Sequence, residues 1–298
     1  MTILPRRILS LKWNCTIPKR GCSVGTPLEL VSARYGDPSK DRSRPPLVIC
    51  HGLFGQKNNW NSVSKTMQRR LGCTIYCVDL RNHGESPWSD TMSYDEMGED
   101  LAAFLGNICK ETGFSQFHLL GHSMGGRLVM RMAVHPSWQR LIDRLIVEDV
   151  SPKVYDLDFK AHVTFRSYIH AMAALDMTKS RKELLKELEH IVPDIGTRQF
   201  LLTNLAPSEN GVSRWRCNLE AIDKNLEGIL RFTVPDGVFK GPTLFVYGEK
   251  SGYIRDQDRD YVRTLFPDVR FDSIANSGHW VHAEQPDAFM NSVCRFLE

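Results

Sequence analysis

The sequence predicts an α/β protein in which a mostly parallel sheet is flanked by helices and interrupted by a helical insertion. Short apolar runs alternate with amphipathic stretches in the first half of the chain. This alternation stops after Ser151-Pro152 and resumes near Gly241. Alternating strands and helices are typical of a parallel sheet, whereas the intervening stretch has only helical periodicity.

The predicted strands are short apolar runs bounded by turn residues, at 45–50, 74–79, 117–120, 145–147, 243–247 and 269–274. The predicted helices lie between them, at 62–71, 94–109, 127–134, 261–266 and from 286 onward. In residues 94–109, Met97, Leu101, Leu105 and Ile108 recur at helical spacing. The order of these elements predicts one sheet made from two separated parts of the chain.

The insertion is predicted to be entirely helical and to cover the sheet as a cap. One apolar face consists of Leu184, Leu185, Leu188 and Ile191, and a second of Phe200, Leu201, Leu202 and Leu205. We therefore divide the chain into a leader (1–28), a core (29–150 and 241–298) and a helical cap (151–240).

Composition is typical of a globular protein: 298 residues, 42% hydrophobic and 24% charged. A net charge of +3 is too small to indicate a nucleic-acid-binding face. No uncharged apolar run approaches the length of a transmembrane segment. The eight cysteines form no CxxC pair, which favours reduced thiols in an intracellular compartment.

The first 28 residues contain Arg6, Arg7, Lys12, Lys19 and Arg20, and the first acidic residue is Glu29. An acid-free, basic leader with interspersed leucine and isoleucine is typical of a mitochondrial transit peptide. A basic tail without a targeting role is the alternative. We expect the protein to be mitochondrial, in the matrix.

Gly121-His122-Ser123-Met124-Gly125 matches G-x-S-x-G and lies between a predicted strand and a predicted helix. That context is typical of a nucleophile elbow, in which a tight turn exposes the serine hydroxyl. Ser123 is therefore the candidate nucleophile. The helix that follows offers N–H groups to a developing oxyanion.

A serine hydroxyl needs a base to take its proton. His279 follows the last predicted strand, and the carboxyl ends of parallel strands meet at one edge of a sheet. We expect His279 to be this base. His51, His83, His122 and His282 are interpreted as loop or elbow residues.

Residues 51–55, His-Gly-Leu-Phe-Gly, follow the strand predicted to lie beside the elbow strand. The loop at this place normally donates one oxyanion N–H, and the residue after the nucleophile donates the other. The expected donors are the backbones of Leu53 and Met124, with Phe54 beside them as a substrate-binding residue.

Five segments resemble the α/β-hydrolase family, and specifically a group of animal lipid-ester hydrolases and their bacterial esterase relatives. These are residues 51–55, 79–87, 121–126, 149–152 and 278–283. The resemblance runs from about residue 28 to the C-terminus. It implies an eight-stranded, mostly parallel sheet with a helical cap after strand six. It also implies ester hydrolysis and, for animal members, acylglycerol-type lipid esters and association with the 2-oxoglutarate dehydrogenase complex.

The resemblance leaves the acid of the triad open. The usual position is the loop 248–252, which has no aspartate and places Ser251 there. Asp149, at the end of the strand next to the elbow strand, occupies the alternative position. Glu249 lies near the usual position, and Glu220 matches a cap carboxylate sometimes assigned as the acid. We predict that Asp149 orients His279, with Ser251 as a second hydrogen-bond partner and as a substrate-binding residue.

The predicted function is a serine hydrolase that cleaves carboxylic esters, of lipid or medium-chain type, by Ser-His-Asp acyl transfer. The alternatives are a thioesterase and a scaffold that binds a mitochondrial dehydrogenase complex with little or no catalysis. The chain has no dinucleotide-binding or P-loop motif and no metal-binding pattern with the required residues, so no cofactor or metal is predicted.

Overall fold

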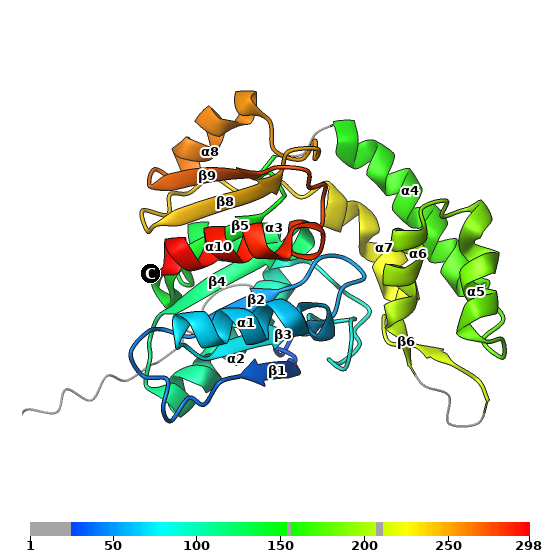
Figure 1. Ribbon diagram of the computed structural model, residues 1–298, viewed down its shortest axis with the longest axis horizontal. Helices are drawn as coiled ribbons and strands as arrows, with labels where there is room; N and C mark the ends of the chain where they lie inside the picture. Colours follow the sequence, from blue (N-terminus) through cyan, green and yellow to red (C-terminus); the bar gives the residue numbers. More distant parts are fainter. Residues whose placement is uncertain (1–24, 154–155, 207–210) are drawn as a thin grey trace, which may run out of the picture.

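Seven strands form the central sheet in a computed structural model that describes residues 25–153, 156–206 and 211–298 (Figure 1). In sheet order they are β1 (Ser32–Tyr35), β3 (Ile75–Val78), β2 (Leu47–Cys50), β4 (Phe117–His122), β5 (Ile142–Glu148), β8 (Thr243–Gly248) and β9 (Val269–Ile274). The edge strand β1 is antiparallel to β3, and every other pair is parallel. The predicted strands are all present, with bounds that differ by up to three residues.

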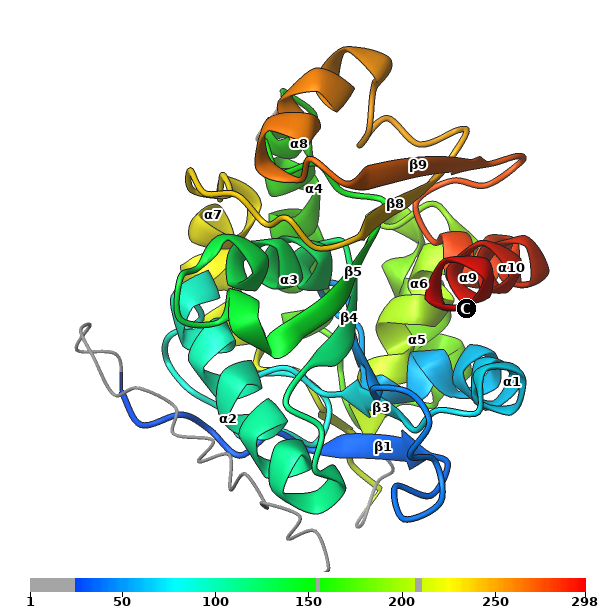
Figure 2. The ribbon, with the colours of Figure 1, turned by 90° about the vertical axis from the view of Figure 1, so that its left-hand side faces the viewer.

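Helices cover both faces of the sheet (Figure 2). On one face lie α1 (Asn61–Leu71), α9 (Val281–Glu284) and α10 (Pro286–Leu297); on the other lie α2 (Tyr94–Thr112), α3 (Met124–Val134) and α8 (Arg259–Leu265). Strands β2, β3, β4 and β8 are buried along their whole length. Burial on both faces explains why these strands read as continuous apolar runs instead of alternating patterns.

Local sequence signals fix the ends of α2. The Ser93 hydroxyl accepts a 3.2 Å hydrogen bond from the Glu96 N–H, and the Glu96 carboxylate accepts one from the Ser93 N–H at 2.9 Å. Gly113 ends the helix with a φ of 80°. A serine cap of this kind contributes about 1 kcal/mol to helix stability.

The insertion between β5 and β8 lies at one end of the molecule (Figure 1). It contains α4 (Asp156–Ala173), α5 (Arg181–Glu187), α6 (Ile195–Leu201) and α7 (Leu219–Leu230). It is not entirely helical, because β6 (Leu205–Ala206) and β7 (Arg214–Trp215) form an antiparallel pair. Two-residue strands are too short to produce a periodic pattern in the sequence.

The apolar faces predicted for the cap are only partly buried. Leu184 and Leu188 are buried, but Ile191 is 47% exposed. Ile191 follows the 3-10 helix Leu188–His190, which has about three residues per turn, so α-helical spacing no longer determines which way its side chain points.

The central sheet has seven strands among the described residues, where the resemblance implied eight. The backbone N–H groups of Leu28 and Val31, which precede β1, donate to the side chains of Asp100 (2.7 Å) and Ser86 (2.8 Å). This segment is thereby bonded to α2 and to the loop after β3 instead of a neighbouring strand. Because the sheet has one strand fewer than expected, the cap follows its fifth strand in chain order and not its sixth.

Most of the proposed leader, residues 1–24, lies outside the described residues. Among the helices that the structure describes, none combines the length and the apolar character needed to cross a membrane.

Candidate active site

Ser123 occupies a sharp turn between β4 and α3. Its backbone has a φ of 53° and a ψ of −114°, in a region that non-glycine residues rarely adopt. A 3.0 Å hydrogen bond from the Ser123 N–H to the Glu148 carbonyl ties the turn to β5. Such a backbone costs about 1–3 kcal/mol and persists only where its surroundings hold it.

The glycines around Ser123 permit this turn. A Cβ at Gly121 would lie 2.1 Å from the Gly125 carbonyl oxygen, and one at Gly125 would lie 2.3 Å from the Cys50 carbonyl oxygen. A Cβ at Gly52 would lie 3.2 Å from the Ser123 Cβ. The ends of β2 and β4 and the start of α3 approach one another this closely only because these positions lack side chains.

His279 and Asp149 are paired. Nδ1 of His279 lies 2.6 Å from Oδ2 of Asp149, whose side chain is fully buried, whereas the His279 side chain is 18% exposed. Because a carboxylate accepts, Nδ1 carries the proton and Nε2 retains its lone pair. An imidazole held in this tautomer is the form that can take a proton from a serine.

Two further donors hold Asp149. The Ser251 hydroxyl donates to Oδ2 at 2.6 Å, and the Gly248 N–H donates to Oδ1 at 3.1 Å. Gly248 ends β8, and Ser251 lies in the loop after it, which is the usual position of the triad acid. In this protein that loop supplies hydrogen-bond donors, and the carboxylate comes from the end of β5. Ser251 thus hydrogen-bonds to Asp149 and does not line either of the cavities that contain Ser123, so its predicted contact with substrate stays a prediction.

The other two acidic candidates lie elsewhere. The exposed Glu249 accepts a 3.1 Å hydrogen bond from the Asn276 N–H. Glu220, in the first turn of α7, borders a separate surface cavity with Trp88 and Lys224. The structure therefore brings Asp149, and neither glutamate, to His279.

His122 and His282, which the sequence indicates only as elbow or loop residues, support the loop that contains His279. Nε2 of His122 donates to the His279 carbonyl at 3.0 Å, and burial holds the pKa of His122 well below its usual value. The Glu148 carboxylate accepts from both the N–H and Nδ1 of His282, at 2.9 and 2.8 Å. A buried carboxylate–imidazole pair thus fixes α9 immediately after His279.

The oxyanion donors expected from the sequence adjoin Ser123. Leu53 and Met124 line the same small cavity of 20 Å³ as Ser123. Met124 is the first residue of α3, where N–H groups have no intrahelical acceptor. In the 53–55 turn, the Phe54 N–H donates to His83 and the Gly55 N–H to the Gly52 carbonyl. Within the described part of the chain, the Leu53 N–H is the one in this turn left for a ligand.

A larger cavity of about 280 Å³ adjoins these groups and contains both Ser123 and His279. Its other walls are mostly apolar and come from the 53–55 turn, the cap, the loop after β8 and the loop that contains His279: Leu53, Phe54, Phe165, Tyr168, Phe200, Leu201, Tyr253 and Trp280. A further cavity of about 640 Å³ shares His279, Trp280, Phe200 and Thr197 with it. His279 therefore borders two adjoining cavities, and of these two only the smaller is lined by Ser123.

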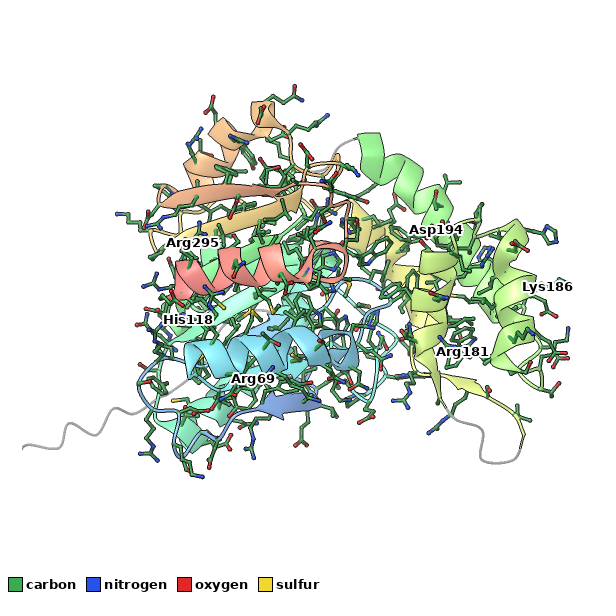
Figure 3. All side chains as sticks on the ribbon, in the orientation of Figure 1. Arg69, His118, Arg181, Lys186, Asp194 and Arg295 are labelled. Carbon is green, nitrogen blue, oxygen red and sulfur yellow. The ribbon has the colours of Figure 1, made fainter. Side chains whose placement is uncertain are left out.

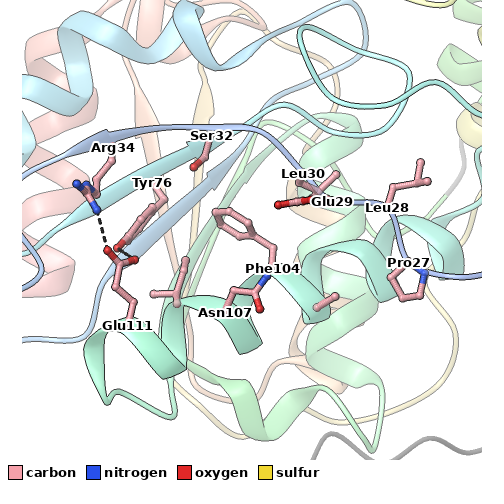
Figure 4. Close-up of a pocket in the computed structure, with 12 residues that line it drawn as sticks. Pro27, Leu28, Glu29, Leu30, Ser32, Arg34, Tyr76, Phe104, Asn107 and Glu111 are labelled. Carbon is pink, nitrogen blue, oxygen red and sulfur yellow. Dashed lines mark hydrogen bonds and ion pairs between the residues drawn. The ribbon is translucent and has the colours of Figure 1, made fainter.

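A separate cavity of about 730 Å³ lies between the segment leading into β1 and the helix α2 (Figure 4). Glu111 there accepts hydrogen bonds from Arg34 and Tyr76, at 2.7 and 3.1 Å. It shares no lining residue with the cavities around Ser123.

Comparisons with known proteins agree with this geometry. Residues 45–168 match the α/β hydrolase fold family. The chain is 40% identical over 259 residues to the sn-1-specific diacylglycerol lipase ABHD11 of Danio rerio, covering 85% of this chain and 78% of that protein. It is 32% identical over 255 residues to esterase YbfF of Escherichia coli, covering 85% of this chain and 92% of that protein. A solved marine microorganism esterase superposes with a TM-score of 0.79 at 34% identity, over 91% of this chain and 100% of that one.

The chain therefore belongs to the α/β-hydrolase family. Within that family it groups with the carboxylic ester hydrolases.

Proposed function

We propose that this ester hydrolase works through a covalent acyl-enzyme formed on Ser123. The Ser123 oxygen attacks the ester carbonyl while Nε2 of His279 accepts the hydroxyl proton, and the negative charge moves to the carbonyl oxygen. The N–H groups of Leu53 and Met124 stabilise that oxyanion. His279 then gives its proton to the leaving alcohol as the C–O bond breaks, and water regenerates the serine by the same steps.

The observation that carries this mechanism is the 2.6 Å contact between His279 and the buried Asp149, in the wall of the cavity that also contains Ser123. Asp149 stabilises the imidazolium that forms when His279 takes the proton. A protein that only bound a partner would not need this pair beside a half-buried serine with a strained backbone. The pairing therefore favours an enzyme over a scaffold.

The substrate that we propose is a lipid-type or medium-chain ester. The mostly apolar 280 Å³ cavity at Ser123 suits the acyl chain. The leaving alcohol must lie against His279, so the adjoining 640 Å³ cavity suits the alcohol portion. The diacylglycerol lipase name of the similar Danio rerio protein supports an acylglycerol-type substrate. Thioesters would use the same groups.

The decisive experiment compares Ser123→Ala with the matched change Ser273→Ala, at an exposed serine on β9. Ser123→Ala should abolish labelling by a fluorophosphonate and lower ester turnover by about 10⁶-fold. Ser273→Ala should leave both unchanged. Near-normal ester hydrolysis by a correctly folded Ser123→Ala protein would rule out this mechanism.

We also propose that residues 1–28 direct the protein to the mitochondrial matrix, because the segment is basic and free of acidic residues. A fusion of these residues to a fluorescent protein should be imported, and diffuse cytosolic fluorescence would contradict the proposal. Association with a 2-oxoglutarate dehydrogenase complex rests on the family resemblance. Co-purification of that complex with the Ser123→Ala protein would show that binding does not depend on turnover.

A further inference from the structure

Phe54, the residue after the proposed oxyanion donor Leu53, has a left-handed backbone with a φ of 59°. A bulky residue seldom adopts this conformation unless neighbouring groups hold it there. Two buried side chains hydrogen-bond to its backbone, one at the N–H and one at the carbonyl. The Phe54 N–H donates to Nε2 of His83 at 3.2 Å, and the Phe54 carbonyl accepts from Nδ2 of Asn204 at 2.7 Å.

His83 is suited to accept this hydrogen bond. Because Nε2 accepts from Phe54, the ring proton must be on Nδ1, which donates to the Arg81 carbonyl at 3.0 Å. Burial lowers the pKa of His83 to about 3, so the ring is neutral and Nε2 keeps its lone pair at physiological pH.

A second histidine makes the reciprocal link. Nε2 of His51, in the turn that contains Leu53, accepts from the Leu80 N–H at 3.0 Å. His51 therefore binds the loop that contains His83, and His83 binds the turn that contains His51. The two rings lie 5.0 Å apart.

The loop that contains His83 is itself rigid. The buried Asp79 carboxylate accepts from the Lys57 N–H at 2.6 Å, from Nζ of Lys57 at 2.7 Å and from the Glu85 N–H at 2.9 Å. Gly84 has a φ of 59°, and a Cβ there would lie 2.2 Å from this carboxylate. His83 thus contacts Phe54 from a fixed position.

Asn204 belongs to the cap and follows α6 closely in the chain. It is fully buried, and its neighbour Thr203 accepts a 2.8 Å hydrogen bond from Nε2 of Gln56 through its carbonyl. The cap therefore hydrogen-bonds to Phe54 and to Gln56, which lie in and directly after the 53–55 turn. These contacts connect the cap to the backbone around Leu53 as well as to the substrate cavity.

We propose that His83 and Asn204 are positioning residues that hold the Phe54 peptide groups so that the Leu53 N–H points at the oxyanion. The cap then completes the oxyanion site through Asn204 in addition to enclosing substrate. This inference rests on the proposed function, because it assigns Leu53 as an oxyanion donor.

The test compares His83→Gln, His83→Leu and Asn204→Leu with two matched controls. Asn225→Leu also removes a cap amide, one that donates to the Asp90 carbonyl at 3.0 Å outside this turn. His118→Leu removes a buried histidine at the amino end of β4, at the far end of the sheet from the cap (Figure 3). A fluorophosphonate titration first counts the working sites, so that misfolded protein does not affect the rates.

Per working site, His83→Leu and Asn204→Leu should lower kcat by about 10- to 100-fold, as expected for a displaced oxyanion donor. KM should change little. The affinity for a trifluoromethyl ketone ester analogue, whose adduct places an oxyanion in the same site, should fall by the same factor as kcat/KM. His83→Gln keeps an acceptor and should lose less than His83→Leu, and both controls should retain wild-type values.

The double variant His83→Leu/Asn204→Leu should lose less than the product of the single losses, because both residues hold the backbone of the same residue, Phe54. A normal kcat per working site, with only fewer sites, would show that the residues act in folding alone and would overturn the inference. So would a raised KM with unchanged affinity for the ketone. Neither result affects the assignment of Ser123, which the Ser123→Ala comparison tests separately.

Discussion

Nδ1 of His279 and Oδ2 of Asp149 lie 2.6 Å apart although 130 residues separate them in the chain. The sheet order explains this contact. Asp149 follows β5, which pairs with β8, and β8 pairs with β9, the strand that precedes His279. A carboxylate at the end of β5 can therefore reach the same imidazole as a carboxylate in the loop after β8. In this protein the loop after β8 has no aspartate and supplies the Ser251 hydroxyl, which donates to Asp149.

Replacing Asp149 by asparagine should lower kcat by about 10⁴-fold, because an amide can hold His279 in the wrong tautomer and cannot stabilise the imidazolium. Steady-state kinetics with a p-nitrophenyl ester measure this loss. Glu220→Gln and Glu249→Gln are the matched controls and should retain wild-type rates. A severe loss in either control, with a mild loss in Asp149→Asn, would show that the acid has been misassigned.

Ser251→Ala should have a smaller effect. It removes one of the hydrogen bonds that the buried Asp149 accepts but leaves those from His279 and Gly248. A hydrogen bond to a charged group contributes about 1.5–3 kcal/mol. We expect only part of this energy to raise the activation free energy of hydrolysis, which corresponds to a loss of about 10-fold in kcat. In an Asp149→Asn background, Ser251→Ala should add little further loss, since the two act as a unit. Independent, multiplying losses would place Ser251 in another role.

The sequence predicted the parts of the site that have a local signature. Ser123 lies in a strand–turn–helix motif whose glycines and serine are contiguous, and His279 follows a strand with clear apolar character. The positions of the strands followed from runs that are buried on both faces. These features depend on neighbouring residues in the chain, so periodicity and spacing reveal them.

The supporting contacts had no such signature. His83, His282 and Asn204 each act on a residue more than 25 positions away, and only the folded chain brings these groups together. The same is true of the missing eighth strand, since the N–H groups before β1 are satisfied by side chains of Asp100 and Ser86 that are distant in sequence. A buried histidine and a loop histidine look alike until the tertiary neighbours are known.

The folded protein should lose stability as pH falls below about 6.5, the ordinary pKa of histidine. The pKa of His83 is lowered to about 3 in the fold, mainly by burial and then by the nearby His51, with Asp79 opposing. Between these values the unfolded chain binds a proton that the folded chain does not. The free energy of unfolding therefore falls by about 1.4 kcal/mol per pH unit for this residue as pH decreases.

Urea denaturation at pH 7.5 and pH 5 measures this loss. His83→Gln should be less stable than wild type at pH 7.5 but should show a smaller loss between the two pH values. An equal loss in both proteins would show that His83 does not contribute to the pH dependence. His51 and His122 also have lowered pKa values through burial, so part of the loss should remain in the variant.

The mostly apolar cavity at Ser123 should make longer acyl chains better substrates. Phe165 of α4 borders both cavities that contain Ser123, and its ring lies 6.0 Å from that of Phe54. Each methylene removed from water contributes about 0.8 kcal/mol, or about fourfold in kcat/KM. Across p-nitrophenyl esters from acetate to octanoate, kcat/KM should rise until the cavity is full, mainly through a lower KM.

Phe165→Ala should enlarge this cavity and move the best substrate to a longer acyl chain, with the short esters little affected. The matched control is Val163→Ala, because Val163 lies on the same helix but its side chain is 61% exposed. A flat or falling profile from acetate to octanoate in the wild-type protein would show that the aromatic cap residues only pack the cap against the core. An unchanged optimum in Phe165→Ala, together with a rising wild-type profile, would place the acyl chain in the adjoining 640 Å³ cavity beside His279 and Trp280 instead.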